Sequence, residues 1–298
     1  MSVKEIIGKK IREEREKRGF SRERLCGDEE ELTVRQLARI ELGQSLPSLI
    51  KLEYIAQVLD TDLATLLAGE SISIPDEYFT MKYQLFKFPT YGDEERLAKK
   101  IQMVEDIYEK YFDYLPEEEL YMLELVDNTL DYRSTGKTAA AEEVFEDFFK
   151  QLFLKKYYTI NDLLLISYYA LQCQNKGYDR NLLKSLEIKV LEQEISGDEF
   201  YNAELLGTLT AIAGVYLDHA EYSHIKRLSD RMHILIAETQ IHSAKPAALI
   251  YDAKYYLYVE HDVEKARKCY DLVILLAQNF GDPVLEANTL MEREKDSI

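Results

Sequence analysis

The stretch LTVRQLARIELGQSLPSL, residues 32–49, carries the signals that decide the fold of the N-terminal part of the chain. Thr33 and Gln36 have the spacing of a capping box, which predicts that a helix opens at Thr33. Gly43 then provides a stop, and Pro47 lies near the first turn of a further helix. The stretch therefore predicts two helices joined by a tight turn.

Helical signals continue on both sides of this stretch. VKEIIGKKIREEREKRG has apolar residues at helical spacing and ends at Gly19, and Ser21 caps a second short helix, SRERLC. The third helix covers 33–41, a fourth covers SLIKLEYIAQVLD, and Thr61 or Asp62 caps a fifth, DLATLL. The fourth helix has one apolar face, formed by Leu49, Leu52, Ile55, Ala56 and Leu59.

The charge of the chain is distributed unevenly. The formal net charge of the 298 residues is −18, yet residues 1–66 hold 12 Lys and Arg against 13 Asp and Glu. The remaining residues therefore carry −17, and the basic side chains of the first part cluster mostly in 9–39. A local basic face can neutralise phosphates even on an acidic protein, because the attraction depends on local contacts.

The N-terminal pattern resembles the Cro/C1-type (XRE) helix-turn-helix family. The match covers about residues 4–67 and is clearest in LARIELGQSLPSLIKLEYIAQVLD. One difference is GDEEEL at 27–32, a longer and more acidic turn than is usual in the family. The resemblance implies that the start of the third helix reads base edges through Thr33, Arg35, Gln36 and Arg39. It also implies that phosphates contact Ser21, Arg22, Gln44 and Ser45. The alternative is that Arg35 and Arg39 are solvated helix charges.

Beyond a short linker, the rest of the chain is predicted to be helical. Helix-opening signals recur at about 39 to 45 residues, namely at Pro116, Thr159, Asp198, about Ser243 and Asp282, and each interval holds two helical segments. The last full unit resembles a tetratricopeptide repeat. We therefore expect an all-α protein, with a helix-turn-helix domain at 1–67, a linker at 68–77 and a tetratricopeptide-like solenoid at 78–298.

This combination resembles the peptide-pheromone receptors of Gram-positive bacteria, the Rgg, PlcR and PrgX group. The stretches REEREKRGFSRERLC, IPDEYFTMK, KFPTYGDEERL and LPEEEL are similar to streptococcal regulators of competence within this group. The resemblance implies a transcriptional activator in quorum sensing. Such a protein binds a short hydrophobic imported peptide, dimerises, and then binds an inverted repeat in double-stranded promoter DNA.

Repeat geometry predicts which side chains line the concave face of the solenoid, where a peptide is expected to bind. The predicted groove residues are Arg133, Ser167, Leu171, Gln174, Asn175, Gly207, Thr210, Gly214, Tyr251, Tyr255 and Tyr258. Arg96, Lys99 and Lys100 form the nearest basic cluster for a peptide carboxylate. The alternative for the tyrosines is packing between repeats.

An acidic repeat domain is a poor neighbour for DNA but a good partner for Arg35 and Arg39. We therefore hypothesise that Glu117, Glu118 and Glu119 of LPEEEL cover the recognition helix in the absence of peptide. The alternative is that these glutamates face solvent.

Other classes of protein find little support in the sequence. There is no signal peptide, no membrane span, no metal-ligand spacing and no pair of nucleophile and base, so we expect a cytoplasmic protein without a cofactor and without enzymatic activity. The competing hypothesis is a repeat-based interaction scaffold or inhibitor whose helix-turn-helix no longer reads DNA.

Overall fold

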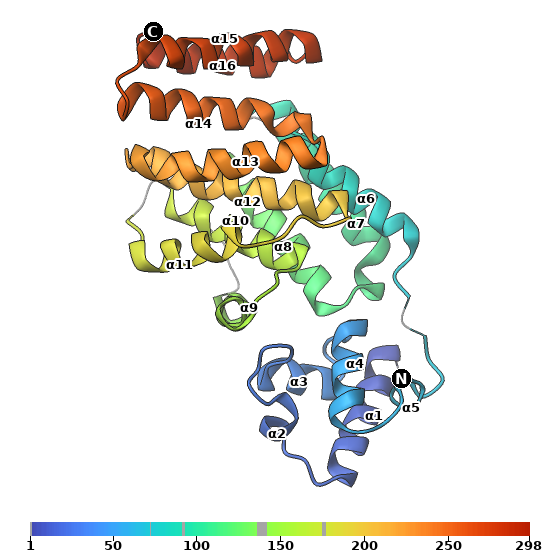
Figure 1. Ribbon diagram of the computed structural model, residues 1–298. Helices are drawn as coiled ribbons and strands as arrows, with labels where there is room; N and C mark the ends of the chain where they lie inside the picture. Colours follow the sequence, from blue (N-terminus) through green and yellow to red (C-terminus); the bar gives the residue numbers. More distant parts are fainter. Residues whose placement is uncertain (1, 72, 91–92, 136–141, 175–176) are drawn as a thin grey trace. The chain divides into compact units, whose positions relative to one another are not determined.

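The computed structural model describes residues 2–71, 73–90, 93–135, 142–174 and 177–298. Every regular element within them is helical, which confirms the all-α prediction (Figure 1). The chain divides into two compact units, Met1–Lys87 with Lys100–Lys156 and Phe88–Lys99 with Tyr157–Ile298.

The first unit begins with five helices that match the five predicted ones. They are α1 (Val3–Lys17), α2 (Arg22–Cys26), α3 (Val34–Glu41), α4 (Leu49–Val58) and α5 (Leu63–Leu67). Ser2, Ser21, Thr33, Ser48 and Asp62 cap them, each accepting a hydrogen bond from a backbone N–H in the first turn. The predicted capping box of Thr33 and Gln36 is confirmed.

The core of these five helices is apolar and tightly packed. Ile7, Ile11, Leu37, Leu52 and Ile55 are fully buried. The approach of α1 to α3 requires a glycine, because a Cβ on Gly8 would lie 2.0 Å from the carbonyl oxygen of Ile40.

One prediction for the core is wrong. Leu49 is 53 % exposed, although it was assigned to the apolar face of its helix. It is the first residue of α4, after the cap at Ser48 and beyond the edge of the core that the helix covers.

The remaining helices form stacked pairs. The first unit also holds α6 (Asp76–Lys87), most of α7 (Glu94–Tyr111), α8 (Glu117–Thr135) and α9 (Glu142–Leu154). The second unit holds α10 (Ile160–Cys173), α11 (Arg180–Leu191), α12 (Glu199–Asp218), α13 (Ile225–Thr239), α14 (Lys245–Tyr258), α15 (Val263–Phe280) and α16 (Pro283–Lys295). Three short 3-10 segments are Phe112–Tyr114, Tyr222–His224 and His242–Ala244.

The order of stacking in the second unit follows the chain. Each of α12 to α15 packs against the next helix along the sequence, as in a solenoid (Figure 1). Thr159, Asp198 and Asp282, predicted from the sequence as helix openings, are the N-caps of α10, α12 and α16. The predicted repeat period is therefore confirmed, because each interval holds one pair of helices.

Candidate functional site

The predicted recognition helix is α3, and its four candidate side chains have different environments. Arg35 is exposed, whereas Thr33 and Gln36 are buried. The side-chain oxygen of Gln36 accepts from the backbone N–H of Thr33 at 3.0 Å, and the Thr33 hydroxyl accepts from that of Gln36 at 3.1 Å. Gln36 therefore caps its own helix in this structure, and Arg35 is the candidate most open to solvent.

Arg22, a predicted phosphate contact, belongs to a charged network inside the N-terminal domain. Its Nε lies 2.8 Å from Glu41 Oε2, and Arg15 binds both oxygens of Glu41 at 2.5 and 3.0 Å. The Glu41 side chain has no exposed surface. Hydrogen bonding to Glu41 raises the pKa of Arg15 despite its partial burial. This network joins α1, α2 and α3.

The other predicted phosphate contacts differ in exposure. Ser21 accepts a hydrogen bond from the backbone N–H of Arg24 at 3.1 Å, as the cap of α2. Gln44 is exposed, whereas the hydroxyl oxygen of Ser45 is buried without a hydrogen-bond partner. Gln44 is therefore the more accessible of the two turn residues.

The first turn of α8 contacts the helix-turn-helix. Arg39 Nε donates to Glu117 Oε1 at 2.5 Å, with about a quarter of the arginine side chain exposed. Glu118 Oε1 forms an ion pair with Lys51 Nζ at 2.7 Å and accepts a hydrogen bond from the Ser48 hydroxyl at 3.1 Å. The backbone N–H of Glu117 also donates to the carbonyl of Leu46 at 3.2 Å.

These contacts change the pKa of the Glu118 carboxyl. Burial acts to raise the pKa of its carboxyl, but the positive charge of Lys51 and the hydrogen bonds from Lys51 and Ser48 outweigh burial and lower the pKa. The carboxylate is thus stabilised in its ionised form by groups of the N-terminal domain.

Glu119 has a different role from its two neighbours. Its Oε2 accepts from Lys82 Nζ at 2.6 Å and from the Tyr78 hydroxyl, and both donors lie on α6. The hydrogen bonds of Glu119 therefore tie α8 to α6 within the repeats.

A third contact with the N-terminal domain comes from α9. Gln151 Nε2 donates to the carbonyls of Glu29 and Glu30 at 3.0 and 3.2 Å, and Gln151 Oε1 accepts from Gln36 at 3.4 Å. Glu29 and Glu30 lie in the long acidic turn at 27–32, so this turn provides carbonyl acceptors for the repeats.

Sequence reasoning missed Ser48, Lys51 and Gln151. Lys51 is only 5 % exposed, which would mark it as a contact residue, but the sequence alone does not show that this lysine is buried. Their partners lie between 67 and 122 residues away along the chain, and no local pattern encodes such a separation.

The second unit brings several predicted groove residues together. The Tyr251 hydroxyl donates to the carbonyl of Thr210 at 2.7 Å. A Cβ built on Gly214 would lie 2.6 Å from Gln174 Nε2 and 3.6 Å from the Tyr251 hydroxyl oxygen. Residues of α12 and α14 and the residue that caps α10 thus meet where Gly214 has no side chain.

The remaining groove candidates lie in mixed surroundings. Gly207 is exposed, and the nearest atom to a built Cβ is Glu204 Oε1 at 3.6 Å, so a side chain there has space. The Ser167 hydroxyl lies 3.0 Å from that of Thr208, and Leu171 is buried, so both face neighbouring helices.

Two of the predicted groove tyrosines pack against other aromatic rings. Tyr258 stacks on Tyr222 with ring centroids 4.2 Å apart and donates to Asp296 at 2.8 Å, and Tyr255 packs edge-on against Tyr256. Tyr258 therefore packs against neighbouring repeats, whereas the ring contact of Tyr255 lies within its own helix.

The basic candidates for a peptide carboxylate are divided between the two units. Arg96 makes a bidentate ion pair with Asp282 at 3.0 and 3.2 Å, inside the second unit. Lys100 and Arg133 belong to the first unit. Asn175 and the side chain of Arg133 lie outside the described residues.

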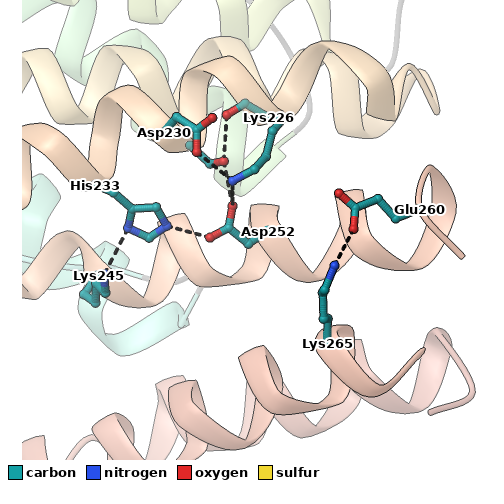
Figure 2. Close-up of polar contacts among 8 residues, drawn as sticks. Lys226, Asp230, His233, Lys245, Asp252, Glu260 and Lys265 are labelled. Atoms are coloured by element: carbon teal, nitrogen blue, oxygen red, sulfur yellow. Dashed lines mark hydrogen bonds and ion pairs between the residues drawn. The ribbon is translucent and has the colours of Figure 1, made fainter. Parts of the chain in front are cut away.

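The α14 helix, which carries three of the groove tyrosines, is fixed to α13 by a buried carboxylate (Figure 2). Asp252 accepts from the Ser229 hydroxyl at 2.7 Å, from His233 Nε2 at 2.6 Å and from Lys226 Nζ at 3.2 Å. Lys245 donates to His233 Nδ1 at 3.0 Å, which places the ring proton on Nε2.

The acidity of Asp252 reflects this network. Burial acts to raise its pKa, but the hydrogen bonds from His233 and Ser229 and the charge of Lys226 lower it overall. The network therefore holds α14 against α13 through Asp252.

The part of the chain that the structure describes holds neither a metal-ligand cluster nor a membrane-spanning helix. No group of three or more His, Cys, Asp or Glu side chains there could hold a metal ion. No described helix is long and apolar enough to cross a membrane.

Comparison with known proteins identifies the family of the chain. The family model for the ComR tetratricopeptide domain matches residues 75–293, and no curated protein matches. The apo form of the competence regulator ComR from Streptococcus vestibularis is similar at 43 % identity over 100 % of both chains, with a TM-score of 0.90.

Two solved structures of ComR from Streptococcus thermophilus are also similar. The apo form is 40 % identical over 98 % of this chain and 99 % of that one, with a TM-score of 0.89. The complex with DNA and the signalling peptide ComS is 41 % identical over 98 % and 100 %, with a TM-score of 0.72. The structure is thus more similar to the ligand-free relatives than to this complex, and the chain belongs to the ComR family of competence regulators.

Proposed function

We propose that this protein is a cytoplasmic, peptide-gated transcriptional activator. Its N-terminal domain binds double-stranded promoter DNA, its repeats bind a short hydrophobic signalling peptide, and peptide binding produces the homodimer that recognises an inverted repeat. The solved complexes of relatives with DNA and with signalling peptides support this proposal. The observation that carries it is the ion pair between Arg39 of the recognition helix and Glu117 of the repeats.

The ion pair supports a closed form that does not bind DNA. An arginine that donates to a carboxylate at 2.5 Å is unavailable for a guanine edge or a phosphate. Lys51 is held by Glu118 in the same way. The repeats therefore occupy cations of the N-terminal domain with carboxylates, which imitate the charge of the DNA backbone.

Peptide binding is proposed to release these contacts. A ligand shifts the equilibrium only by its differential affinity for the two forms, so the peptide must bind the open form better. We place the peptide near Thr210, Gly214 and Tyr251. The side-chain amide of Gln174, the backbone carbonyl of Thr210 and the small Gly214 lie together there, and such groups suit a peptide backbone. The coupling joins this groove to the Arg39 contact.

The test is a titration of a ComS-type peptide against a labelled promoter fragment, with oligomeric state followed by light scattering. We expect weak specific DNA binding without peptide and a dimeric complex with it. Arg35→Ala should weaken specific binding by about 1–3 kcal/mol, the value of a bidentate base contact, with unchanged thermal unfolding. Peptide binding without any gain in DNA binding would instead favour the interaction scaffold.

A further inference from the structure

A cavity of about 670 Å³ lies inside the first unit, between the helix-turn-helix and the start of the repeats. The N-terminal domain contributes Ser45 and Leu46 to its wall, and the repeats contribute residues of α7 and α8. The volume is in the range of small-molecule sites, roughly 300–1,000 Å³. The predicted peptide groove does not reach this cavity, whereas three predicted DNA contacts, Arg39, Gln44 and Ser45, lie in its wall.

The wall on α8 alternates between charged and apolar residues. Glu117 and Glu124 both line the cavity, with Leu120 and Tyr121 between them. Seven residues of helix separate the two carboxylates by about 10 Å along the axis. The wall therefore presents two anions at opposite ends of an apolar stripe.

Aromatic rings form much of the remaining wall. Tyr108, Phe112 and Tyr114 lie at the end of α7 and just after it, and more than half of the Phe112 and Tyr114 side chains is exposed. Faces of such rings attract organic cations, and their edges and faces pack well against methylene groups.

Two acceptor atoms at one end of the cavity lack a donor. Glu117 Oε2 and Ser45 Oγ are buried without a hydrogen-bond partner, whereas Glu117 Oε1 accepts from Arg39. Buried acceptors of this kind are uncommon, and a donor from a bound molecule satisfies them. At the other end, burial and the nearby charge of Asp127 raise the pKa of Glu124, which a bound cation would reverse.

We propose that this cavity binds a linear aliphatic polyamine. One ammonium group donates to Glu117 Oε2 and Ser45 Oγ, a second pairs with Glu124, and the methylene chain lies along Leu120 and Tyr121. Lys4 also lines the cavity, and its positive charge repels a bound cation. A cation that pairs with only one carboxylate therefore binds weakly. A polyamine that reaches both carboxylates gains two ion pairs and the apolar contact.

The ligand has a defined effect on the switch, and this part rests on the proposed function. A polyamine in the cavity contacts the N-terminal domain and α8 at once, and it leaves the bond between Arg39 and Glu117 Oε1 intact. It therefore binds the closed form in preference to the open form and stabilises it.

The first experiment is calorimetric titration of the full chain with spermidine, which is long enough to span the two carboxylates. Putrescine, which is too short, and magnesium ion, which has no methylene groups, are the ligand controls. Glu124→Gln should weaken spermidine binding roughly tenfold, the loss of one ion pair of about 1.4 kcal/mol. The matched control Glu105→Gln removes the same charge from α7 outside the cavity wall and should leave binding unchanged.

Absence of spermidine binding would overturn the site. Equal binding of spermidine, putrescine and magnesium, or an equal effect of Glu105→Gln, would also overturn it, because either result indicates a general counterion effect. Neither result bears on DNA or peptide binding, so the proposed function is tested separately.

The second experiment is hydrogen exchange without DNA or peptide. Spermidine should increase protection of the α3 amides in the wild-type chain and not in Glu124→Gln. Spermidine that binds at Glu124 but leaves α3 exchange unchanged contradicts the effect on the closed form.

Discussion

Glu41 and Glu117 both accept hydrogen bonds from arginines, yet their surroundings differ. Glu41 has no exposed side-chain surface and binds Arg15 and Arg22 of its own small domain. Glu117 is 14 % exposed and binds Arg39 across the boundary between that domain and the repeats. An arginine–carboxylate pair that is fully enclosed, as at Glu41, stabilises the fold. The same kind of pair can open and close where the carboxylate is partly exposed, as at Glu117.

The largest effect is expected at the enclosed pair. Glu41→Gln removes the main counter-charge of the buried Arg15 and leaves it only the more distant Glu16 at 3.7 Å. Breaking a buried pair from one side costs about 3–5 kcal/mol. The N-terminal domain should lose stability by that order, and promoter binding should fall with and without peptide. Chemical denaturation and a binding assay measure both. A variant of native stability would show that Glu41 is not required for the fold.

Glu117→Lys should act on the switch and spare the fold. It replaces an attraction to Arg39 with a repulsion, and a charge-assisted hydrogen bond contributes about 2 kcal/mol, so the open form should gain at least roughly tenfold. Promoter binding without peptide should rise, with little change in unfolding.

Glu119→Lys is the matched control for this variant. It makes the same change two residues along α8, where the hydrogen bonds come from Tyr78 and Lys82 of α6. It should lower the stability of the repeats without making DNA binding independent of peptide. If Glu117→Lys does not bind promoter DNA in the absence of peptide, the contact between Glu117 and Arg39 does not hold the closed form.

Gly207→Leu leaves the ion pairs of Glu41 and Glu117 in place and tests the binding of the peptide. The built Cβ has space, so the fold should persist, while the added side chain should obstruct the groove and weaken peptide binding by about 1–3 kcal/mol. Fluorescence anisotropy with a labelled peptide measures this loss, and circular dichroism checks the helix content. Native peptide affinity in the folded variant would place residue 207 outside the groove.

The smallest effect concerns pH. The pKa of Glu118 is lowered from 4.5 in the closed form, so its contribution is complete above that value and is lost as pH falls through the lowered pKa. We expect no change between about pH 6 and pH 8 and a loosening only in acid. NMR titration of the Glu118 carboxyl measures this. Lys51→Met should raise its pKa, and an unchanged titration would exclude Lys51 as its counter-charge.

The sequence predicted the elements much better than the contacts between them. The five N-terminal helices, the capping box at Thr33 and the caps at Thr159, Asp198 and Asp282 follow from local spacing, and all are present. Local rules suffice there because a cap and its acceptor lie three residues apart.

The partners of the charged residues could be predicted only in part. Glu117, Glu118 and Glu119 were singled out together because an acidic repeat domain suits the arginines of the recognition helix, whereas the structure places Glu119 against Tyr78 and Lys82 of α6. Ser48, Lys51 and Gln151 were not identified. Their contacts depend on how α4 and α9 pack, and no spacing rule gives that. Arg22 was assigned to phosphates because the sequence does not show that Glu41 lies beside it.

The three glutamates at the start of α8 occupy successive positions of one helical turn. Successive residues point about 100° apart, so Glu117, Glu118 and Glu119 reach Arg39, Lys51 and Lys82 from a single rigid element. Glu117 and Glu118 bind the N-terminal domain while Glu119 binds α6, so a movement of α8 together with α6 shifts both N-terminal contacts and keeps the Lys82 pair. We therefore expect the Arg39 and Lys51 contacts to be released together, because both carboxylates belong to one turn of one helix.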